Sequence, residues 1–566
     1  MKKSFLLTLL LSLPAIIYAQ QPIFKWAGGL GGDQQDRGHA ITVDDSGNVY
    51  TTGRFQDTAD FDPGAGTVNL ITNNQDDVFV TKMDSSGNLI WAKQLGGPNY
   101  QTSYAVEVDA AGAVYITGEF DDTADFDPGP GTYNLVSYGG RDIFICKLSA
   151  AGNFVWANQI GHSSSLNEES VADLVLDATA NIYVTGYFYD NIDFDPGVGT
   201  NFINTIGTGT DQFILKLDSA GNFVYVKQFG GTGTALVESI AIDAAGNLYC
   251  TGVFSNTIDF DPGVGVSNLS APMGVQIYAF KLSAAGTLAW AKQFGEPVGG
   301  NIQGGTGIAV DAAGNVYITG LFDGPGDYDP GPGTFTLTPA GLDDVFIAKF
   351  DPAGNFTWAK RIGSTGHDVG RSIDVDASGN VYVTGVVTDT VDFDPGAGTQ
   401  LLQSTGEKAF TLKLNTGGNF VWATNLNSGE GYSVIVDQAM NVYSTGSFSG
   451  VNDFDPGAGV YNLTGILDVY VQKLSQPTVS VSSIKLDEPV ITLYPNPNNG
   501  HFNIKSTLQL ENASIKVQSI NGQTVVAQSG LNGRQLSFDL PDLVSGVYFV
   551  EINTASSRSV FKLVKK

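Results

Sequence analysis

The chain has 566 residues and carries 57 Asp and Glu against 28 Lys and Arg, a formal net charge of −29 at pH 7. Residues 485–566 hold 8 of the cations and only 6 of the anions, so the negative excess lies in the part before them. A field of that sign repels phosphate backbones and anionic membrane surfaces, and it excludes nucleic acid as a partner. It is compatible with solubility outside the cell or with the binding of cations.

The first residues have the pattern of a secretory signal. Lys2 and Lys3 precede an apolar stretch over residues 5–17, and the small residue Ala19 precedes a cleavage point before Gln20. We therefore predict a signal peptide over residues 1–19. Since no later segment approaches the length of a membrane span, we expect no transmembrane segment and a soluble, exported mature chain.

A unit of roughly 65 residues recurs seven times along most of the chain. Its most regular part is the pentapeptide Asp-Phe-Asp-Pro-Gly, which is Asp-Tyr-Asp-Pro-Gly in one copy. The pentapeptides lie at 60–64, 125–129, 193–197, 259–263, 327–331, 392–396 and 453–457. A repeat of this period indicates a solenoid, a propeller or another array of small units.

Each copy is expected to contain four β-strands. The first, typified by residues 40–44, ends in Asp in every copy, and a tight turn rich in Asp, Gly and Asn follows it. The second strand carries Tyr and then Thr-Gly, while the third and fourth are typified by residues 77–82 and 89–95. Alternating apolar positions, β-branched and aromatic residues, and Gly, Asn and Asp at the turns favour strands throughout.

The seventh copy lacks a fourth strand, and the N-terminus contains a segment that matches one. The fourth strands of the first six copies carry an aromatic residue, namely Trp91, Trp156, Tyr225, Trp290, Trp358 and Trp422. The remaining tryptophan, Trp26, lies in a similar segment at residues 24–32. Pairing this segment with the seventh copy closes a ring without exposed edges, whereas an open solenoid would end in atypical caps. We therefore predict an all-β fold, a seven-bladed β-propeller over residues 23–474, with the N-terminal strand closing blade seven.

Strand order divides the loops between two faces of the expected propeller. Turns from first to second and from third to fourth strands share one face, and they are short and uniform. Loops from second to third strands and crossings between blades share the other face, with all the pentapeptides and the irregular stretches 161–170, 296–306 and 363–371. Because binding residues concentrate on loops of a rigid scaffold, this second face is the predicted functional face.

The pentapeptide is also a candidate Ca²⁺ site. Its two carboxylates lie on one side of an extended segment, and five copies have Asp or Asn three residues earlier. The candidate ligands are Asp57, Asp60, Asp62, Asp122, Asp125, Asp127, Asp190, Asp193, Asp195, Asp259, Asp261, Asp327, Asp329, Asp392, Asp394, Asp453 and Asp455. The preferred alternative is a structural turn, because Pro and Gly fix turn geometry and Asp accepts hydrogen bonds from the backbone beyond it.

Every third strand carries a lysine, which offers these carboxylates a partner within the same blade. The seven are Lys82, Lys147, Lys216, Lys281, Lys349, Lys413 and Lys473. A feature present in every blade is expected to serve the folding of the blade, so lysine–aspartate pairing is the structural interpretation of the pentapeptide.

No catalytic set of residues is predicted, and no cofactor is expected apart from the candidate Ca²⁺. Of the four histidines, His39, His162 and His367 are placed at crossings between blades, and His501 lies in the C-terminal part. No two of them have the spacing of zinc ligands. We expect single loop histidines of this kind to be solvated polar residues.

The last part of the chain differs from the repeats. Residues 475–488 lack the repeat pattern and are predicted to be a linker. Residues 489–566 contain Tyr-Pro-Asn-Pro from position 494, Ser-Gly-Val-Tyr from position 545 and a basic C-terminus. They closely resemble the type A C-terminal sorting domain of the type IX secretion system of Bacteroidota. The resemblance implies an immunoglobulin-like β-sandwich, transport across the outer membrane by the type IX secretion machinery, and removal of the domain at export.

The repeats resemble the SBBP-type β-propeller repeats of bacterial secreted proteins. The resemblance rests on Asp-x-x-Gly-Asn-x-Tyr-x-Thr-Gly and Trp-Ala-Lys, and it covers residues 23–474. Because that family is defined by its fold, the resemblance implies no catalytic residues for this chain.

Three hypotheses of function stay open. The preferred one is a non-enzymatic propeller, extracellular or on the outer-membrane surface, that binds a glycan or protein ligand on its irregular face. The enzyme alternative is a secreted hydrolase or lyase that degrades polysaccharide in the central channel. The third is a structural surface protein that depends on calcium.

Overall fold

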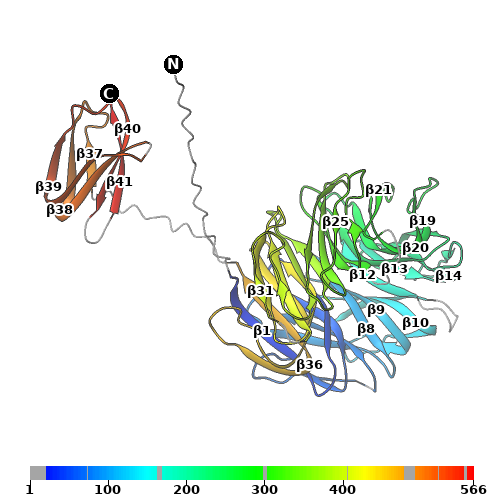
Figure 1. Cartoon of the computed structure of the whole chain (residues 1–566). Coiled ribbons are helices and arrows are strands. Elements are labelled where there is room, and N and C mark those ends of the chain that lie inside the picture. The colour runs from blue at the N-terminus through cyan, green and yellow to red at the C-terminus, as the bar shows by residue number, and fades with distance from the viewer. Residues whose placement is uncertain are drawn as a thin grey trace. The chain divides into compact units, whose positions relative to one another are not determined.

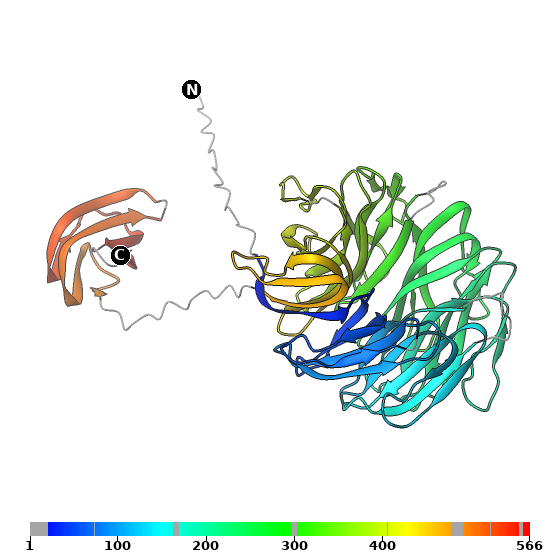
Figure 2. The ribbon, with the colours of Figure 1, turned by 90° about the horizontal axis from the view of Figure 1, so that it is seen from below.

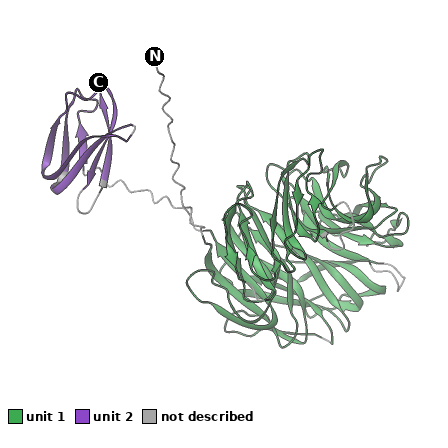
Figure 3. Ribbon diagram, viewed as in Figure 1, with its two compact units in different colours: residues 1–477 green, residues 478–566 purple. Residues whose placement is uncertain are grey.

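The computed structural model describes residues 21–72, 74–161, 169–296, 303–403, 406–476, 491–520, 522–553 and 558–566. The signal peptide predicted at 1–19 and most of the linker predicted at 475–488 lie outside these residues. The chain divides into two compact units, Met1–Pro477 and Thr478–Lys566, drawn in green and purple in Figure 3. In the described ranges, the structure has no helix with the length and apolar character of a membrane span.

The first unit consists of four-stranded antiparallel sheets, one for each repeat, as in the blades of a propeller (Figure 1). The first strands are β2 (Arg37–Val43), β8 (Gln101–Val108), β12 (Ser170–Leu176), β18 (Ala235–Ile242), β22 (Gln303–Val310), β28 (Val369–Val375) and β34 (Glu430–Val436). The second strands are β3 (Val49–Phe55), β9 (Val114–Asp125), β13 (Ile182–Phe188), β19 (Leu248–Asp259), β23 (Val316–Phe322), β29 (Val381–Val387) and β35 (Asn441–Asp453).

The third and fourth strands complete the sheets. The third strands are β6 (Asp77–Met83), β10 (Asn134–Leu148), β16 (Asp211–Leu217), β20 (Asn268–Leu282), β26 (Asp344–Phe350), β32 (Lys408–Leu414) and β36 (Asn462–Ser475). The fourth strands of the first six repeats are β7 (Leu89–Leu95), β11 (Phe154–Ile160), β17 (Phe223–Gly231), β21 (Leu288–Phe294), β27 (Phe356–Ile362) and β33 (Phe420–Asn425).

The loops that hold the pentapeptides are themselves partly paired. In the second, fourth and seventh repeats the second and third strands extend into the loop and pair with each other there. In the other repeats, separate short strands form this hairpin: β4 (Thr58–Asp60) with β5 (Asn69–Ile71), β14 (Asn191–Asp193) with β15 (Phe202–Asn204), β24 (Gly326–Asp327) with β25 (Thr336–Leu337), and β30 (Val391–Asp392) with β31 (Leu401–Leu402). Every pentapeptide therefore begins at the end of a paired strand.

The N-terminal strand β1 (Ile23–Gly32) takes the place of the fourth strand in the seventh repeat. It pairs antiparallel with β36, from Ile23 opposite Ser475 to Leu30 opposite Val469. Figure 2 shows this contact between the blue start of the chain and the orange end of the repeats. Leu30 is fully buried in a core cluster with side chains of both the first and the seventh repeat, so this strand is part of the packed structure.

Tryptophans of five fourth strands, that of β1 included, join one sheet to the next. The indole nitrogen of Trp26 donates a hydrogen bond to the Ser85 carbonyl at 3.1 Å, in the turn between the third and fourth strands of the first repeat. A Cβ atom on Gly87 in that turn would lie 2.7 Å from the Trp26 ring, and Gly87 has the left-handed φ of 86°. Glycine is required there by both conditions. The same contact joins Trp91 to Gly152, Trp156 to Gly221, Trp290 to Gly354 and Trp358 to Gly418.

The second unit is a bent antiparallel sheet of β37 (Ile491–Tyr494), β38 (His501–Ser519), β39 (Thr524–Asp539), β40 (Gly546–Asn553) and β41 (Arg558–Lys565). The first half of β38 pairs with β37 and β39, and its second half with β39 and β40. A bridge between Asn498 and Lys565 brings the beginning and the end of the unit together. Its core contains Ile504, Ile515 and Val550, all with 0–1% exposure.

Truncating Trp26 tests the role of the N-terminal strand. We expect Trp26→Ala to lower the free energy of unfolding of the first unit by about 1–3 kcal/mol, because it removes a half-buried indole and its hydrogen bond. Trp91→Ala, at the equivalent place in the first repeat, is the matched control and should cost a similar amount. Urea unfolding followed by fluorescence measures both. No effect of Trp26→Ala beside a clear effect of Trp91→Ala would contradict the closure.

Candidate binding site

The pentapeptides anchor the scaffold through their aromatic residue. Phe61 is fully buried and lies between Phe55 and Phe79, with ring centroids 5.2 and 4.9 Å away. The aromatic residues at this position in the other repeats are equally buried, namely Phe126, Phe194, Phe260, Tyr328, Phe393 and Phe454. Burial of a large ring in each blade fixes where the loop begins.

The pentapeptide carboxylates accept backbone hydrogen bonds. Asp60 accepts from the backbone N–H of Asp62 at 3.0 Å and of Val68 at 2.9 Å, and Asp62 accepts from Gly64 at 2.8 Å. The same bonds recur in the other repeats on Asp125, Asp127, Asp193, Asp195, Asp259, Asp261, Asp327, Asp329, Asp392, Asp394, Asp453 and Asp455. These contacts support the structural turn as the role of the motif.

The residue three positions before the pentapeptide has a left-handed backbone conformation in five repeats. Asp57, Asp122 and Asp190 have φ values of 60–70°, and Asn256 and Asp389 have φ values of 53° and 58°. Asp and Asn tolerate this left-handed conformation better than other residues with a side chain. Among the described residues, no group of three or more His, Cys, Asp or Glu is arranged to hold a metal ion. The calcium site therefore stays a prediction from the sequence.

The first Asp of the pentapeptide also joins neighbouring repeats. Gly31 of β1 pairs with Asp60, and the Gly after a later fourth strand pairs with the corresponding Asp of the following repeat. The further pairs are Gly96 with Asp125, Gly161 with Asp193, Gly230 with Asp259, Gly295 with Asp327 and Gly363 with Asp392. Backbone pairing between blades thus gives the motif a second structural role in six of the seven repeats.

The third-strand lysines contact the opposite end of the blade, so the predicted pairing with the pentapeptides is wrong. The Nζ atom of Lys82 lies 5.0 Å from the centre of the Tyr50 ring, and the Tyr50 hydroxyl donates to Asp44 at 3.0 Å. All seven lysines make this contact with the tyrosine of the second strand, at 4.6–5.0 Å. The physical reason is strand direction, because the lysine is near the end of the third strand and the pentapeptide precedes its start.

The strand-terminal Asp holds the turn on that face. Asp44 accepts hydrogen bonds from the backbone of Ser46 and Asn48, both at 2.9 Å, and from the Asn48 side chain at 2.8 Å. These bonds keep the pKa of Asp44 below its usual value, against the opposing effect of its partial burial. A cavity of about 400 Å³ on this face is lined by Asp44, Asp109 and Lys82, among others. Since hydrogen bonds within the turns already engage the Asp44 carboxylate, the cavity does not identify a ligand.

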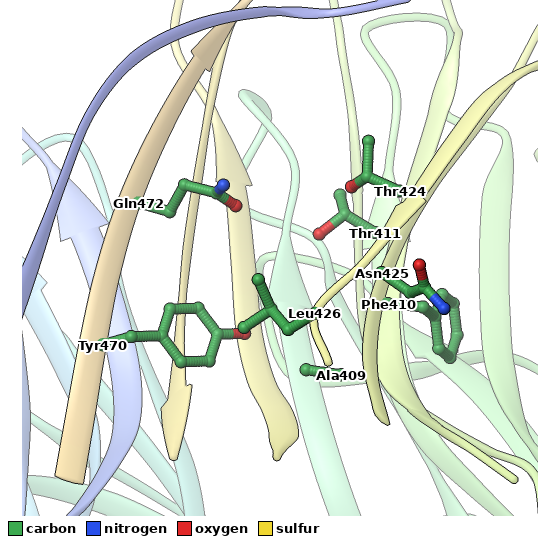
Figure 4. Close-up of a pocket in the computed structure, with 8 residues that line it drawn as sticks. All are labelled: Ala409, Phe410, Thr411, Thr424, Asn425, Leu426, Tyr470 and Gln472. Carbon is green, nitrogen blue, oxygen red and sulfur yellow. The ribbon is translucent and has the colours of Figure 1, made fainter. Parts of the chain in front are cut away.

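Other cavities are also poor candidates. One of about 10 Å³ between the sixth and seventh repeats, shown in Figure 4, is lined by Leu426, Tyr470 and Gln472 and has space for about one water molecule. A third, of about 480 Å³, lies at the crossing after β1 and is lined by Gln34, Gln35 and Ile466 among others. Most of its wall is backbone and turn residues, with one exposed apolar side chain in Ile466.

The first strand of each repeat, which contacts the first strand of the next repeat, departs from regular pairing at one residue. The pairing of each first strand with its second strand shifts register at one residue, which is a β-bulge. The bulged residues are His39, Tyr104, Ala172, Glu238, Thr306, Arg371 and Tyr432. Each of them is half-buried or exposed. We call these seven residues the bulge ring.

One part of the bulge ring forms a continuous set of side-chain contacts. The His39 ring is stacked on Tyr104, with centroids 5.8 Å apart, and meets Tyr432 edge to face at 5.4 Å. The guanidinium carbon of Arg371 lies 4.7 Å from the centre of the Tyr432 ring. The sixth, seventh, first and second repeats thus present an Arg–Tyr–His–Tyr arc, whereas the third to fifth present Ala172, Glu238 and Thr306.

His39 is a neutral acceptor in this arc. Its Nδ1 atom lies 2.8 Å from the Ser103 carbonyl oxygen. Since a carbonyl oxygen only accepts, Nδ1 carries the proton and Nε2 presents a lone pair. Burial lowers the pKa of His39 to about 4, with a smaller effect of the charges on Arg54, Arg37 and Arg371. The prediction that His39 is a solvated loop residue is wrong, because the bulge brings it into β2 and packs its ring between two tyrosines.

The remaining histidines lie elsewhere. His367 contacts Asp343 through Nδ1, and Nδ1 of His501 in the second unit lies 2.9 Å from Asp539. His162 lies outside the described residues, as do most of the irregular stretches predicted at 161–170 and 296–306. The stretch at 363–371 is described, and it ends at Arg371 of the arc.

Arginines surround the arc on the predicted functional face. Arg37, two residues before His39, donates from Nη1 to the Tyr432 hydroxyl at 3.2 Å. Arg54 and Arg141 both lie over the Tyr100 ring, at 5.7 and 4.3 Å. Four of the five arginines in the repeats are therefore gathered here, in a region with a large negative excess.

Sequence reasoning placed the functional face on the side with the crossings, where these arginines lie, but it did not single out the residues. A signal was present in the sequence. The position five residues before the strand-terminal Asp reads His, Tyr, Ala, Glu, Thr, Arg and Tyr through the seven copies, so four of the seven copies carry an aromatic, imidazole or guanidinium group there. The bulge that turns this position outward has no sequence signature of its own.

The first prediction from this site concerns the pentapeptide turn. Asp60→Ala should lower the free energy of unfolding by about 1–3 kcal/mol, because two backbone N–H groups lose their acceptor. Asp60→Asn keeps one oxygen acceptor and should cost less than half as much. A chelator should leave the melting temperature of the native protein unchanged. If the chelator lowers it by several degrees and added calcium restores it, these carboxylates bind the ion.

The second prediction concerns pH. Burial raises the pKa of Asp77, at the start of β6, to about 7, and a similar effect raises that of Asp211 to about 6. The ordinary value in an unfolded chain is about 4, so the folded state holds these protons more tightly. Their contribution to stability is complete below about pH 4 and is lost as the pH rises through about 7.

The free energy of unfolding should therefore fall between pH 5 and 8 on the order of 1 kcal/mol or more. Asp77→Asn, which mimics the protonated acid, should flatten this dependence and gain relative stability only at the higher pH. Denaturant titrations at both pH values measure it. A slope that Asp77→Asn leaves unchanged would contradict the assignment to this group.

Family models match two parts of the chain. The secretion system C-terminal sorting domain matches residues 492–566, and the Beta-propeller repeat family SBBP matches residues 289–321 and 357–386. The second match covers strands from β21 to β23 and from β27 to β29. Both agree with the resemblances seen in the sequence.

Curated relatives extend beyond the length of this chain. An uncharacterized WD repeat-containing protein of Acanthamoeba polyphaga mimivirus is 25% identical over 507 residues, with 75% of this chain and 36% of that protein covered. Regulatory protein FlaEY of Caulobacter vibrioides is 21% identical over 386 residues, with 65% and 38% covered. The chain thus spans little more than a third of the length of these relatives.

Similar solved structures include cobalt-substituted Synechocystis apocarotenoid oxygenase, which is 10% identical, with 81% of this chain and 98% of that chain covered and a TM-score of 0.34. A gluconolactonase from Xanthomonas campestris is 10% identical, with 64% and 90% covered and a TM-score of 0.25. TM-scores this low carry no argument about this protein. The four-stranded sheets and the family matches together identify a secreted or cell-surface protein of SBBP β-propeller repeats with a type IX secretion C-terminal sorting domain.

Proposed function

We propose that this protein is a non-enzymatic binding protein, exported through the type IX secretion system, that holds a glycan or protein ligand at the arc of Arg371, Tyr432, His39 and Tyr104. The observation that carries the proposal is the arc itself. It joins side chains from four repeats at the bulged position of the first strand, which holds Arg, Tyr, His and Tyr in them. Variation at a fixed place on a repeated scaffold is typical of a recognition site.

The scaffold in this proposal is a closed seven-bladed propeller over residues 23–474. Each innermost strand contacts the next, and β2 of the first repeat contacts β34 of the seventh. The pairing of β1 with β36 supplies the outer strand of the seventh blade. A ring without free edges holds the arc residues in place, so little ordering is needed when a ligand binds.

The second unit serves export in this proposal. Residues 489–566 would form an immunoglobulin-like sandwich recognised by the secretion machinery, and residues 475–488 a linker after the propeller. Support comes from the family match at 492–566 and from a nearly closed all-β sheet with its own core. In this proposal the propeller carries the ligand site, and the second unit directs the chain out of the cell or to its surface.

The experiment is a binding survey with the full chain on a glycan array and on candidate surface proteins. The proposal predicts binding without turnover. The double variant Tyr104→Ala/Tyr432→Ala should weaken it by at least about tenfold, because both rings of the arc are lost. Tyr138→Ala, which truncates an exposed tyrosine in the hairpin of the second repeat, is the control and should bind normally. If the double variant binds as well as the Tyr138→Ala control, the ligand does not bind at the arc. Depolymerisation of a bound glycan would overturn the non-enzymatic function.

A further inference from the structure

We propose that the arc recognises an acidic saccharide, a sugar ring bearing a carboxylate, and that Arg37 receives this carboxylate. The inference rests on the proposed binding function and names its ligand class. It follows from the charge balance of the arginines around the arc, from the hydrogen-bonding state of His39 and from the two tyrosine rings beside it.

Three of the four arginines already have an acidic partner. Arg54 pairs with Asp76, Arg141 lies 3.7 Å from Glu119, and Arg371 lies 2.5 Å from Glu430. Each of these pairs is close to neutral as a unit. They leave the fourth arginine to determine the net charge of the patch.

Arg37 is the exception. Its Nη1 atom donates to a neutral group, the Tyr432 hydroxyl, and no ion pair to Arg37 occurs within the part of the chain that the structure describes. The Nε atoms of Arg37 and Arg371 are buried without a hydrogen-bond partner. A half-buried guanidinium without a counter-charge is costly unless an anion completes it, and the planar fork of Arg matches a carboxylate.

The Tyr432 hydroxyl connects Arg37 with the pair beside it. This hydroxyl donates to Glu430 at 3.1 Å while it accepts from Arg37. Glu430 is thereby shared between Arg371 and Tyr432, and it is linked to Arg37 only through this hydroxyl. Arg37 therefore has no carboxylate in direct contact among the residues that the structure describes.

The other groups of the arc favour a saccharide over an acidic peptide. The Nε2 atom of His39 can only accept, so its partner on the ligand must donate a hydrogen bond. Sugar hydroxyls donate, whereas the side chains of Asp and Glu at neutral pH do not. The rings of Tyr104 and Tyr432 on either side of His39 offer flat apolar surfaces to a sugar ring. An acceptor, an unpaired Arg and aromatic surfaces therefore match one ligand that has hydroxyls, a carboxylate and a ring.

The test is calorimetric titration of the full chain with oligomers of galacturonate, glucuronate and mannuronate, and with the methyl esters of the same oligomers. At least one acid should bind, and its uncharged ester should bind at least about tenfold more weakly. Arg37→Gln should weaken the acid by a similar factor and leave the ester unchanged. Arg37→Lys should retain part of the affinity, since it keeps the charge but not the fork. Lys292→Gln on the outer strand β21 removes the same charge far from the arc and should bind as the unaltered protein does.

The outcomes separate this inference from the proposed function. Equal binding of acid and ester, or no effect of Arg37→Gln on a folded variant, overturns the acidic ligand while the binding function stands. If poly-glutamate binds, its binding depends on Arg37 and no saccharide binds, then the saccharide proposal is overturned and the ligand is an acidic segment of a protein. Binding of no probe in this set or in the survey overturns both. Melting curves establish that each variant is folded. Arg37→Lys and Lys292→Gln are the controls that separate loss of the Arg37 guanidinium from the general effect of a substitution on binding.

Discussion

The packing of five fourth-strand tryptophans against a turn of the next repeat is the contact on which the rest of the first unit depends. Five tryptophans meet a left-handed glycine in this way, and at Trp26 the contact reaches from the start of the chain to Gly87 of the first repeat. Because β1 also pairs with β36, one segment joins the first and the last repeats twice. Without it, the seventh sheet would have a free edge, and the ring of innermost strands would have only local contacts to hold it.

Repeated polar groups stabilise this ring rather than form binding sites. Asp44 and its equivalents hold one set of turns, and the lysine of the third strand covers the tyrosine that Asp44 accepts from. Asp60 and its equivalents hold the other set and pair with the preceding blade. These residues recur because the backbone of every repeat needs them, whereas the residues of the bulge ring differ among most repeats.

Most of the fold could be predicted from the sequence, because its signals are local and repeated. The expected strands at 77–82 and 89–95 correspond to β6 and β7, and the segment at 24–32 lies within β1. The first strand was expected only from residue 40, since the bulge at His39 breaks the alternation and makes Arg37 and Gly38 read as loop. The partner of Lys82 was misjudged for a similar reason, because it depends on strand direction and on a tyrosine in another strand.

The candidate site was harder to predict. Its residues come from four repeats, between Arg37 and Tyr432, and nothing in the spacing of the chain brings them together. Only ring closure places the seventh repeat beside the first, which brings Tyr432 of β34 against His39 of β2. Recognition of the site therefore required the closed arrangement and the pairing partner of every arginine, both of which are properties of the tertiary structure.

Closure by the N-terminal strand is the central claim, and hydrogen exchange of the backbone amides of β1 tests it most directly. If β1 is an integral strand of the seventh sheet, the amides of residues 26–30 should exchange as slowly as those of β36 and only through global unfolding of the ring. Fast exchange of residues 26–30 while β36 and the other strands stay protected would contradict the account, because it would show that the ring is stable without them.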